Sequence, residues 1–146
     1  MTVENILTLP AGEVMLKLGG RLLDMLRAAR AETATPMANL LPDWMPNRAA
    51  CHDNADAWVA RHPADAVVRG WLYQRLDPLP EGDQHIFVAH SVIRTGAGDL
   101  IDVTLSENQP TGRFLSHPQD VVGFFALLLN PISPKEFKVI EPRAGR

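Results

Sequence analysis

The sequence predicts an α+β fold with helices on the N- and C-terminal sides of an antiparallel sheet, and three patterns indicate it. Apolar residues recur every three or four positions over residues 11–31, which is typical of one face of a helix. In the middle of the chain β-branched and aromatic runs favour strands. Helical spacing returns over residues 118–129. Because 146 residues with 46% hydrophobic content suffice for one core, we expect a single domain over residues 1–146.

The first helix should cover residues 11–31 and pack on the core through one apolar stripe. That stripe consists of Met15, Leu18, Leu22, Met25, Leu26 and Ala29. Residues 33–48 carry three prolines, each of which disfavours helical geometry in the residue before it, so an irregular connection is predicted there. Leu40, Leu41 and Trp44 are expected to fix this connection to the core.

A second helix should begin at Cys51 and end near His62, where Pro63 follows. Cys51, Asn54 and Trp58 are three or four residues apart and therefore share one side of it. Cys51 is the sole cysteine of the chain. A thiol at a helix N-terminus lies near the positive end of the helix dipole and near unpaired backbone N–H groups, and both favour the thiolate.

Three strands are predicted next, over residues 66–73, 85–94 and 100–105. The second has apolar residues on both faces, which indicates a central position in a sheet. Residues 76–84 are predicted as a polar loop, and the glycine-rich residues 95–99 as a tight turn that makes the last two strands a hairpin. Residues 106–117 should form a surface loop, before the helix over 118–129 and a short strand over 137–140.

His90 and Asp102 lie on the two strands of this hairpin. A turn centred on Gly96 or Ala97 places both side chains on one face, directly opposite or diagonal to each other. A carboxylate there can fix the imidazole tautomer and support the imidazolium that forms when a thiol loses its proton. Together with Cys51 these residues supply a nucleophile, a base and an orienting carboxylate. The hypothesis requires that the Cys51 helix packs against that face with the thiol at its rim.

Four motifs carry a resemblance to a known family. They are Cys51-His52-Asp53-Asn54-Ala55, Val68-Arg69-Gly70-Trp71, His90-Ser91-Val92 and Asp102-Val103-Thr104. In this order, over about residues 48–105, they resemble the transglutaminase-like core of the papain-like cysteine hydrolases. The resemblance implies that the Cys-bearing helix packs on an antiparallel sheet of about three to five strands. It also implies Cys51 as nucleophile, His90 as base and acid, and Asp102 as the residue that orients His90.

The chain departs from that family at the oxyanion donor. Papain-like proteases place a glutamine six residues before the cysteine, where this chain has Met45. Asn47, Asn54 or backbone N–H groups at the helix start are the candidates that remain. Trp71 is a candidate for the wall of the substrate site, and its alternative role is packing in the core. For Asn54 the alternative role is a hydrogen bond to a helix or loop carbonyl. The other histidines are expected at the surface: His52, His62, His85 and His117.

The sequence therefore predicts a cysteine-dependent hydrolase or acyltransferase that acts on an amide or ester bond through a thioester and needs no cofactor. Its substrate would be a peptide, a protein or a small amide or ester. A noncatalytic peptide- or protein-binding module on the same fold is the alternative. A zinc site is less favoured, because the chain has no Cys-x-x-Cys pair and no His-x-x-x-His on a helix. Its ligands would be Cys51, His52, His90 and Asp102.

Charge and apolar patterning exclude other partner classes. A net charge of −3 without a long run of Lys or Arg gives no reason to expect nucleic acid or an anionic membrane. No apolar stretch approaches the roughly 18 residues of a membrane span, and the N-terminus lacks the basic start of a secretory signal. A lone cysteine cannot close an internal disulfide, so the cytoplasm is the expected compartment. The oligomeric state is left open.

Overall fold

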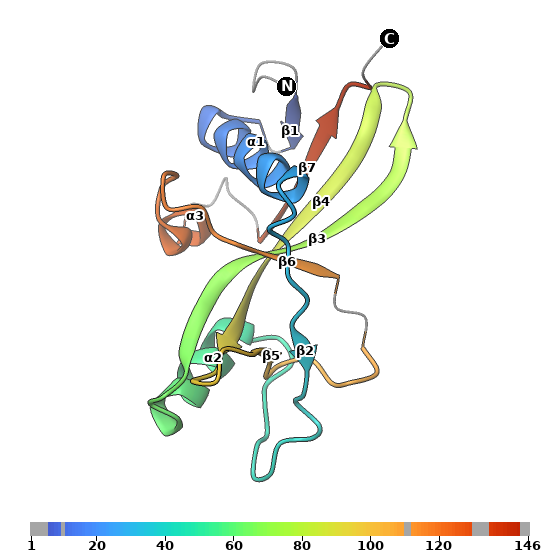
Figure 1. The fold of residues 1–146 in the computed structure, drawn as a ribbon. Helices are drawn as coiled ribbons and strands as arrows, with labels where there is room; N and C mark the ends of the chain where they lie inside the picture. Colours follow the sequence, from blue (N-terminus) through green and yellow to red (C-terminus); the bar gives the residue numbers. More distant parts are fainter. Residues whose placement is uncertain (1–5, 10, 110–111, 130–134, 144–146) are drawn as a thin grey trace.

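The computed structural model describes residues 6–9, 11–109, 112–129 and 135–143. It confirms a mixed α+β architecture with an open, mostly antiparallel sheet (Figure 1). In chain order the elements are β1 (Leu7–Leu9), α1 (Glu13–Arg27), β2 (Thr35–Pro36), α2 (Cys51–Arg61), β3 (Ala66–Leu79), β4 (Gly82–Arg94), β5 (Leu100–Asp102), β6 (Arg113–Ser116), α3 (Phe124–Leu129) and β7 (Glu136–Glu141). The strands lie in the order β1-β7-β4-β3-β6, with β5 beside β4 and β2 parallel to β5.

The centre of the sheet is a long hairpin of β3 and β4, paired from Ala66 and Arg94 at one end to Leu79 and Gly82 at the other. The predicted polar loop over residues 76–84 is therefore wrong, because most of it is strand. Pairing of β7 with residues 83–88 of β4 supplies backbone partners that a local sequence pattern does not reveal.

The prediction of about three to five strands is also wrong, since the described residues form a seven-stranded sheet. Three short strands, β1, β2 and β6, were not predicted. β6 falls inside the expected surface loop over residues 106–117, yet Phe114 and Leu115 are buried. Strands of two to four residues are too short to show an alternating period, and their partners are remote in sequence.

The helices begin and end differently from the prediction. α1 is shorter than the expected 11–31, and α3 covers only the end of the expected 118–129. The carbonyl of Val122 accepts a hydrogen bond from His117 Nε2 at 2.8 Å, and the first α3 bond runs from Leu127 N to Gly123 O at 3.1 Å. The Val122 carbonyl therefore bonds a side chain and not a helical N–H group, so the helix starts after Val122.

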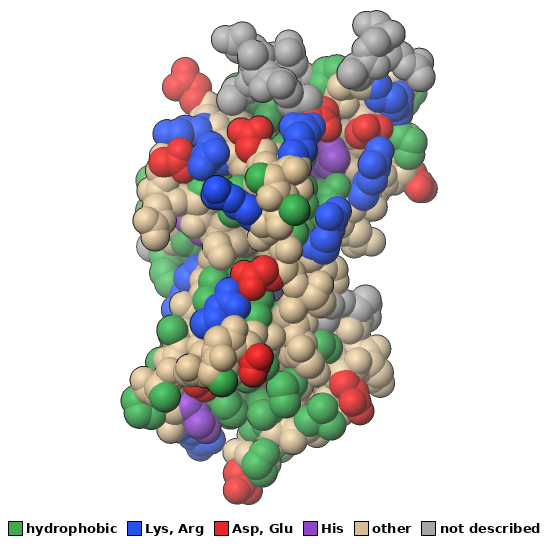
Figure 2. Space-filling model, viewed as in Figure 1, with side chains coloured by type: hydrophobic (Ala, Val, Ile, Leu, Met, Phe, Trp, Pro, Cys, Tyr) green, Lys and Arg blue, Asp and Glu red, His purple; other side chains and the backbone are tan. Residues whose placement is uncertain are grey.

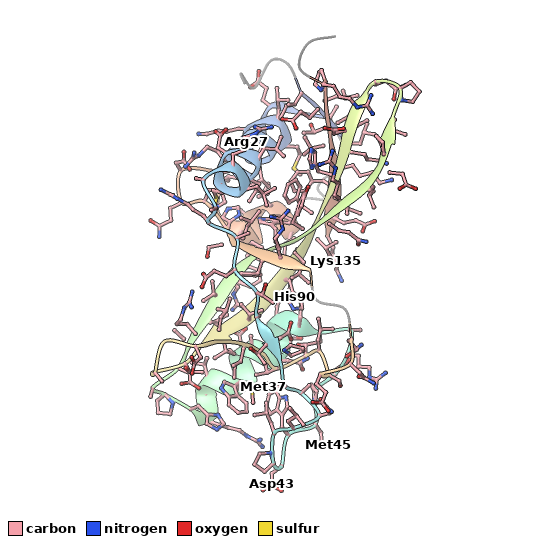
Figure 3. All side chains as sticks on the ribbon, turned by 45° about the vertical axis from the view of Figure 1, so that its right-hand side comes forward. Arg27, Met37, Asp43, Met45, His90 and Lys135 are labelled. Atoms are coloured by element: carbon pink, nitrogen blue, oxygen red, sulfur yellow. The ribbon has the colours of Figure 1, made fainter. Side chains whose placement is uncertain are left out.

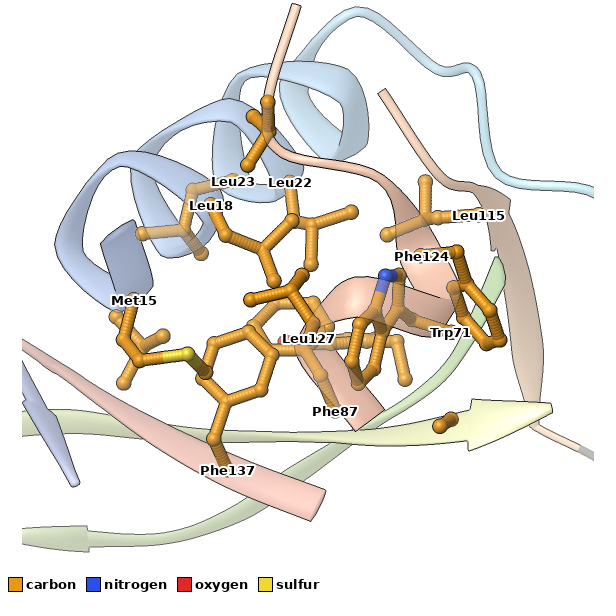
Figure 4. Close-up of a cluster of buried hydrophobic side chains, with 14 of the residues drawn as sticks. Met15, Leu18, Leu22, Leu23, Trp71, Phe87, Leu115, Phe124, Leu127 and Phe137 are labelled. Atoms are coloured by element: carbon orange, nitrogen blue, oxygen red, sulfur yellow. The ribbon is translucent and has the colours of Figure 1, made fainter. Parts of the chain in front are cut away.

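The described residues form three hydrophobic clusters, and two of these occupy opposite ends of the sheet. Figure 4 shows the first, where side chains of α1 and α3 pack on aromatic residues of β3, β4 and β7. In the second, Ala55 and Trp58 of α2 pack on Ile93 and on residues that follow in the chain. Leu41 and Trp44 join this second cluster as expected, but Leu40 is 52% exposed, so that part of the prediction is wrong.

The two ends of the molecule differ in surface character. On the face shown in Figure 2, side chains of both charges intermingle around α1, and hydrophobic side chains gather at the end that holds α2. Among the described residues no helix combines the length and apolarity needed to cross a membrane.

Gly70 of β3 allows β6 to approach closely. It pairs with His90 on one side and Ser116 on the other. A Cβ atom here would collide with the Leu115 carbonyl oxygen and lie 2.7 Å from the Phe114 ring. The neighbour that this glycine accommodates is the short strand β6.

We predict that Gly70→Ala destabilises the protein by about 2 kcal/mol or more, because β6 must move to accept the added methyl group. Urea unfolding followed by circular dichroism measures the loss. Gly123→Ala is the matched control: a Cβ there meets nothing within 4 Å, so its free energy of unfolding should change by less than about 0.5 kcal/mol. Equal midpoints for the two variants would contradict the role given to Gly70.

Candidate active site

The β4–β5 hairpin brings His90 and Asp102 together. Pairing of Ile93 with Ile101 centres the turn on Ala97, which makes His90 and Asp102 diagonal neighbours on one face, the second of the two predicted registers. His90 Nε2 lies 2.6 Å from Asp102 Oδ2. The exposed fractions of the two residues are 6% and 1%, so this pair is shielded from water. The predicted contact between the ring and the carboxylate is confirmed.

The second oxygen of Asp102 closes the end of β5. Its Oδ1 accepts the backbone N–H groups of Thr104 at 2.8 Å and Leu105 at 2.9 Å. Burial raises the pKa of Asp102, but the hydrogen bond and charge of His90, with these two N–H groups, outweigh it and hold the pKa below its ordinary value. Asp102 is therefore an ionised carboxylate in the folded protein near neutral pH.

α2 begins at Cys51, as predicted. The first hydrogen bond of the helix runs from Asn54 N to Ala50 O at 2.9 Å, and no side chain caps the helix start. The backbone N–H groups of Cys51, His52 and Asp53 thus precede the helical ladder. The thiol lies in the positive field of these groups and is half-buried.

The first turn of α2 lies across an edge of β4. On that side β7 pairs with β4 up to Val88 and β5 pairs from Ile93, so the described ladder leaves residues 90–92 unpaired. His90 and Ser91 point to opposite faces because side chains alternate along a strand. His52 Nδ1 lies 2.6 Å from Ser91 Oγ, while Cys51 interacts with His90, each influencing the ionisation of the other.

This placement corrects one requirement of the hypothesis. The body of α2 packs on Ile93, which faces away from His90, and not on the face that carries His90. The thiol nevertheless interacts with His90, and the helix start contacts β4 at Ser91, within the unpaired stretch. Figure 3 shows His90 midway along the molecule, between α1 at one end and Asp43 and Met45 at the other.

Cys51 and His90 favour their charged forms. Burial raises the pKa of the Cys51 thiol, but interactions with His52 and His90 outweigh it and lower the pKa to about 6. Burial lowers the pKa of His90, but the Asp102 carboxylate and the Cys51 sulfur outweigh it and raise the pKa to about 9. Between these two pKa values, Cys51 is favoured as a thiolate and His90 as an imidazolium.

The two asparagines hold the chain in front of α2. Asn54 Nδ2 donates to the Asn47 carbonyl at 2.7 Å and to Thr104 Oγ1 at 2.9 Å, and Asn54 Oδ1 accepts the Asn47 N–H at 3.0 Å. Both amide protons of Asn54 are thus engaged, which favours a structural role. Asn47 is exposed, and its Oδ1 accepts the Ala49 N–H at 3.0 Å.

Trp71 and His85 are buried, and each bonds a partner outside the set of Cys51, His90 and Asp102. Trp71 is 1% exposed within the first hydrophobic cluster, and its indole N–H donates to His117 Nδ1 at 3.1 Å, which favours packing over contact with a substrate. The surface position expected for His85 is wrong: it is 6% exposed and bonds Tyr73 at 2.7 Å and Glu141 at 3.3 Å.

Sequence reasoning missed the part played by His52, which was expected at the surface. It is half-buried and lies 3.8 Å from the Cys51 sulfur through Nδ1. The available signal was the adjacency of two pairs, Cys51 with His52 and His90 with Ser91, which one contact between helix and strand brings together.

The described residues contain no cluster of three or more His, Cys, Asp or Glu side chains arranged to hold a metal ion. Two hollows are lined in part by the 33–48 connection, and neither includes Cys51, His90 or Asp102. Two cavities of about 330 and 240 Å³ flank Met45; Asn54 lines the first and Thr104 the second. A cavity of about 580 Å³ lies between β2 and the β4–β5 turn and does not include Cys51.

Comparisons with protein-family models, with curated proteins and with solved structures find no match to this chain. The chemistry of the site is therefore argued from its geometry. A polarised imidazole between a buried carboxylate and a half-buried thiol can move a proton and sustain a nucleophilic sulfur.

We predict that iodoacetamide alkylates wild-type Cys51 with a rate that rises through about pH 6, where the thiolate forms. In His90→Ala the positive charge beside the sulfur is lost, so the pKa of Cys51 should rise toward its ordinary value of 9.0. At pH 7 the thiolate fraction, and with it the alkylation rate, should fall about tenfold. Coincident pH profiles for the two proteins would show that His90 does not act on the thiol.

Proposed function

We propose that the protein is a cysteine-dependent hydrolase or acyltransferase that acts on an amide or ester bond through a Cys51 thioester. The observation that carries the proposal is the buried 2.6 Å contact of His90 with Asp102, beside a thiol at the start of a helix. Asp102 engages Nε2 of the ring, which leaves Nδ1 for proton transfer. Nucleophile, base and orienting carboxylate then act in the order that the sequence suggested.

In the proposed reaction the Cys51 thiolate attacks the carbonyl carbon of the substrate and forms a carbon–sulfur bond. The His90 imidazolium gives its proton to the leaving amine or alcohol as the carbon–nitrogen or carbon–oxygen bond breaks. A thioester and a neutral His90 remain. His90 then takes a proton from water or an acceptor amine as that molecule attacks the thioester, and the carbon–sulfur bond breaks to restore the thiolate.

Backbone N–H groups are the favoured oxyanion donors. Those of Cys51 and the next residues of α2 precede the helical ladder, and the helix dipole supports negative charge there. Asn54 is less suited, because both protons of its amide already have acceptors. The exposed Asn47, in the loop before α2, remains a candidate donor.

The substrate class follows from the surroundings of the site. The thiol is half-buried at the start of α2, and none of Cys51, His90 and Asp102 lines the hollows beside Met45, so the proposed substrate is a carbonyl presented from outside by a peptide, a protein or a small amide or ester. The order of a Cys helix, a His strand and an Asp strand supports assignment to the transglutaminase-like, papain-like fold. A single cysteine, which cannot close an internal disulfide, supports the cytoplasm as compartment.

We predict that p-nitrophenyl acetate acylates Cys51, with mass spectrometry of the quenched protein locating the acetyl group on that residue. Cys51→Ala should abolish the adduct. His90→Ala should slow acylation at pH 7 by about tenfold, because the thiolate fraction of Cys51 falls; p-nitrophenolate leaves without needing a proton from His90. The control is His62→Ala, which removes an exposed histidine from the far end of the same helix and should leave the rate unchanged.

The noncatalytic alternative predicts a different pattern. A binding module would keep an alkylatable Cys51 but accumulate no acyl-enzyme from a series of p-nitrophenyl esters and peptide thioesters. Acylation that survives in Cys51→Ala would likewise exclude the proposed thioester.

A further inference from the structure

His52 has an arrangement of partners that the proposed mechanism does not use. Its ring lies edge-on to two aromatic residues of α3, with centroid distances of 5.4 Å to Phe124 and 5.8 Å to Phe125. The Arg69 guanidinium lies over the ring of Phe125, with its Cζ atom 4.7 Å from the ring centroid. These contacts fix the plane of a ring next in sequence to the candidate nucleophile.

A chain of polar contacts also holds the His52 ring in place. Arg69 donates to Asp56 Oδ1 at 2.6 Å and to Ser91 Oγ at 2.9 Å. Ser91 Oγ lies 2.6 Å from His52 Nδ1. A serine oxygen has two lone pairs, so it can accept from Arg69 and from an imidazole N–H together. The Cys51 sulfur lies 3.8 Å from the same nitrogen, within reach of a hydrogen bond to sulfur.

We propose that His52 is a second histidine partner of Cys51, a positioning residue that carries its proton on Nδ1 and shares it between Ser91 Oγ and the Cys51 sulfur. The inference rests on the proposed function, in which the sulfur must stay beside His90 to react. His52 holds it there from the side opposite to His90, because His90 and Ser91 point to opposite faces of β4.

The electrostatic surroundings support this role. The titratable groups that act on the thiol are His52 and His90. Behind them, Asp102 bonds His90, Arg69 bonds the His52 carbonyl, and Asp56 bonds Arg69. Burial raises the pKa of Cys51, and the lowering comes from His52 as well as from His90. An N–H on the His52 side stabilises the thiolate without competing for the proton that His90 transfers.

The test compares His52→Ala with His52→Asn by alkylation of Cys51 with iodoacetamide across pH. The side-chain amide of Asn places an N–H near the position of Nδ1, whereas Ala removes it. In His52→Ala the acid limb of the profile should move up by about one pH unit, so the rate at pH 5 falls about tenfold. His52→Asn should stay within about threefold of wild type. His62→Ala is the control for loss of a histidine.

Two results would overturn the proposal. One is a His52→Ala profile that coincides with wild type, and the other is an Asn variant that behaves like the Ala variant. Nitrogen-15 spectra of the wild-type protein provide a measurement that needs no variant: a proton on Nδ1 of His52 supports the proposal, and a proton on Nε2 with a bare Nδ1 refutes it. Alkylation does not depend on turnover, so failure here is distinct from failure to form an acyl-enzyme.

Discussion

The buried carboxylate of Asp102 is the constraint on which the site depends. One oxygen orients His90, and the other accepts two backbone N–H groups that end β5 and turn the chain. That turn presents the Thr104 hydroxyl to Asn54, which in turn holds the Asn47 backbone in front of α2. A carboxylate shielded to this degree is costly unless each oxygen has a partner, and the partners here are the parts that surround the thiol.

The position of the thiol follows from the strand pairing of β4, whose neighbour on one side changes from β7 to β5. β4 is bordered by β7 over its first half and by β5 at its end, and the described ladder has a gap between them. Because neighbouring residues of a strand face opposite ways, the gap offers His90 on one side and Ser91 on the other. The adjacent residues Cys51 and His52 contact one each. A helix packed squarely on either face would reach only one of the two.

The sequence predicted features that local patterns determine. The helix start at Cys51 and the diagonal contact of His90 with Asp102 are confirmed, because helical spacing, turn composition and strand alternation are short-range properties. The strand β6 and the extension of the central hairpin were missed, because their pairing joins remote segments. The burial of His85 and the side from which α2 approaches β4 likewise depend on packing that one sequence does not reveal.

The charged forms of Cys51, His90 and Asp102 depend on one another. For Cys51, His90 and Asp102 burial is the largest influence on ionisation, and in each case it disfavours the charged form. The charged forms are nevertheless favoured, because each group meets an opposite charge or N–H donors on more than one side. The contribution of Asp102 therefore reaches the sulfur through His90. Proton transfer and stability consequently depend on the same contacts, and a change at either end of the chain of groups alters the ionisation of the other.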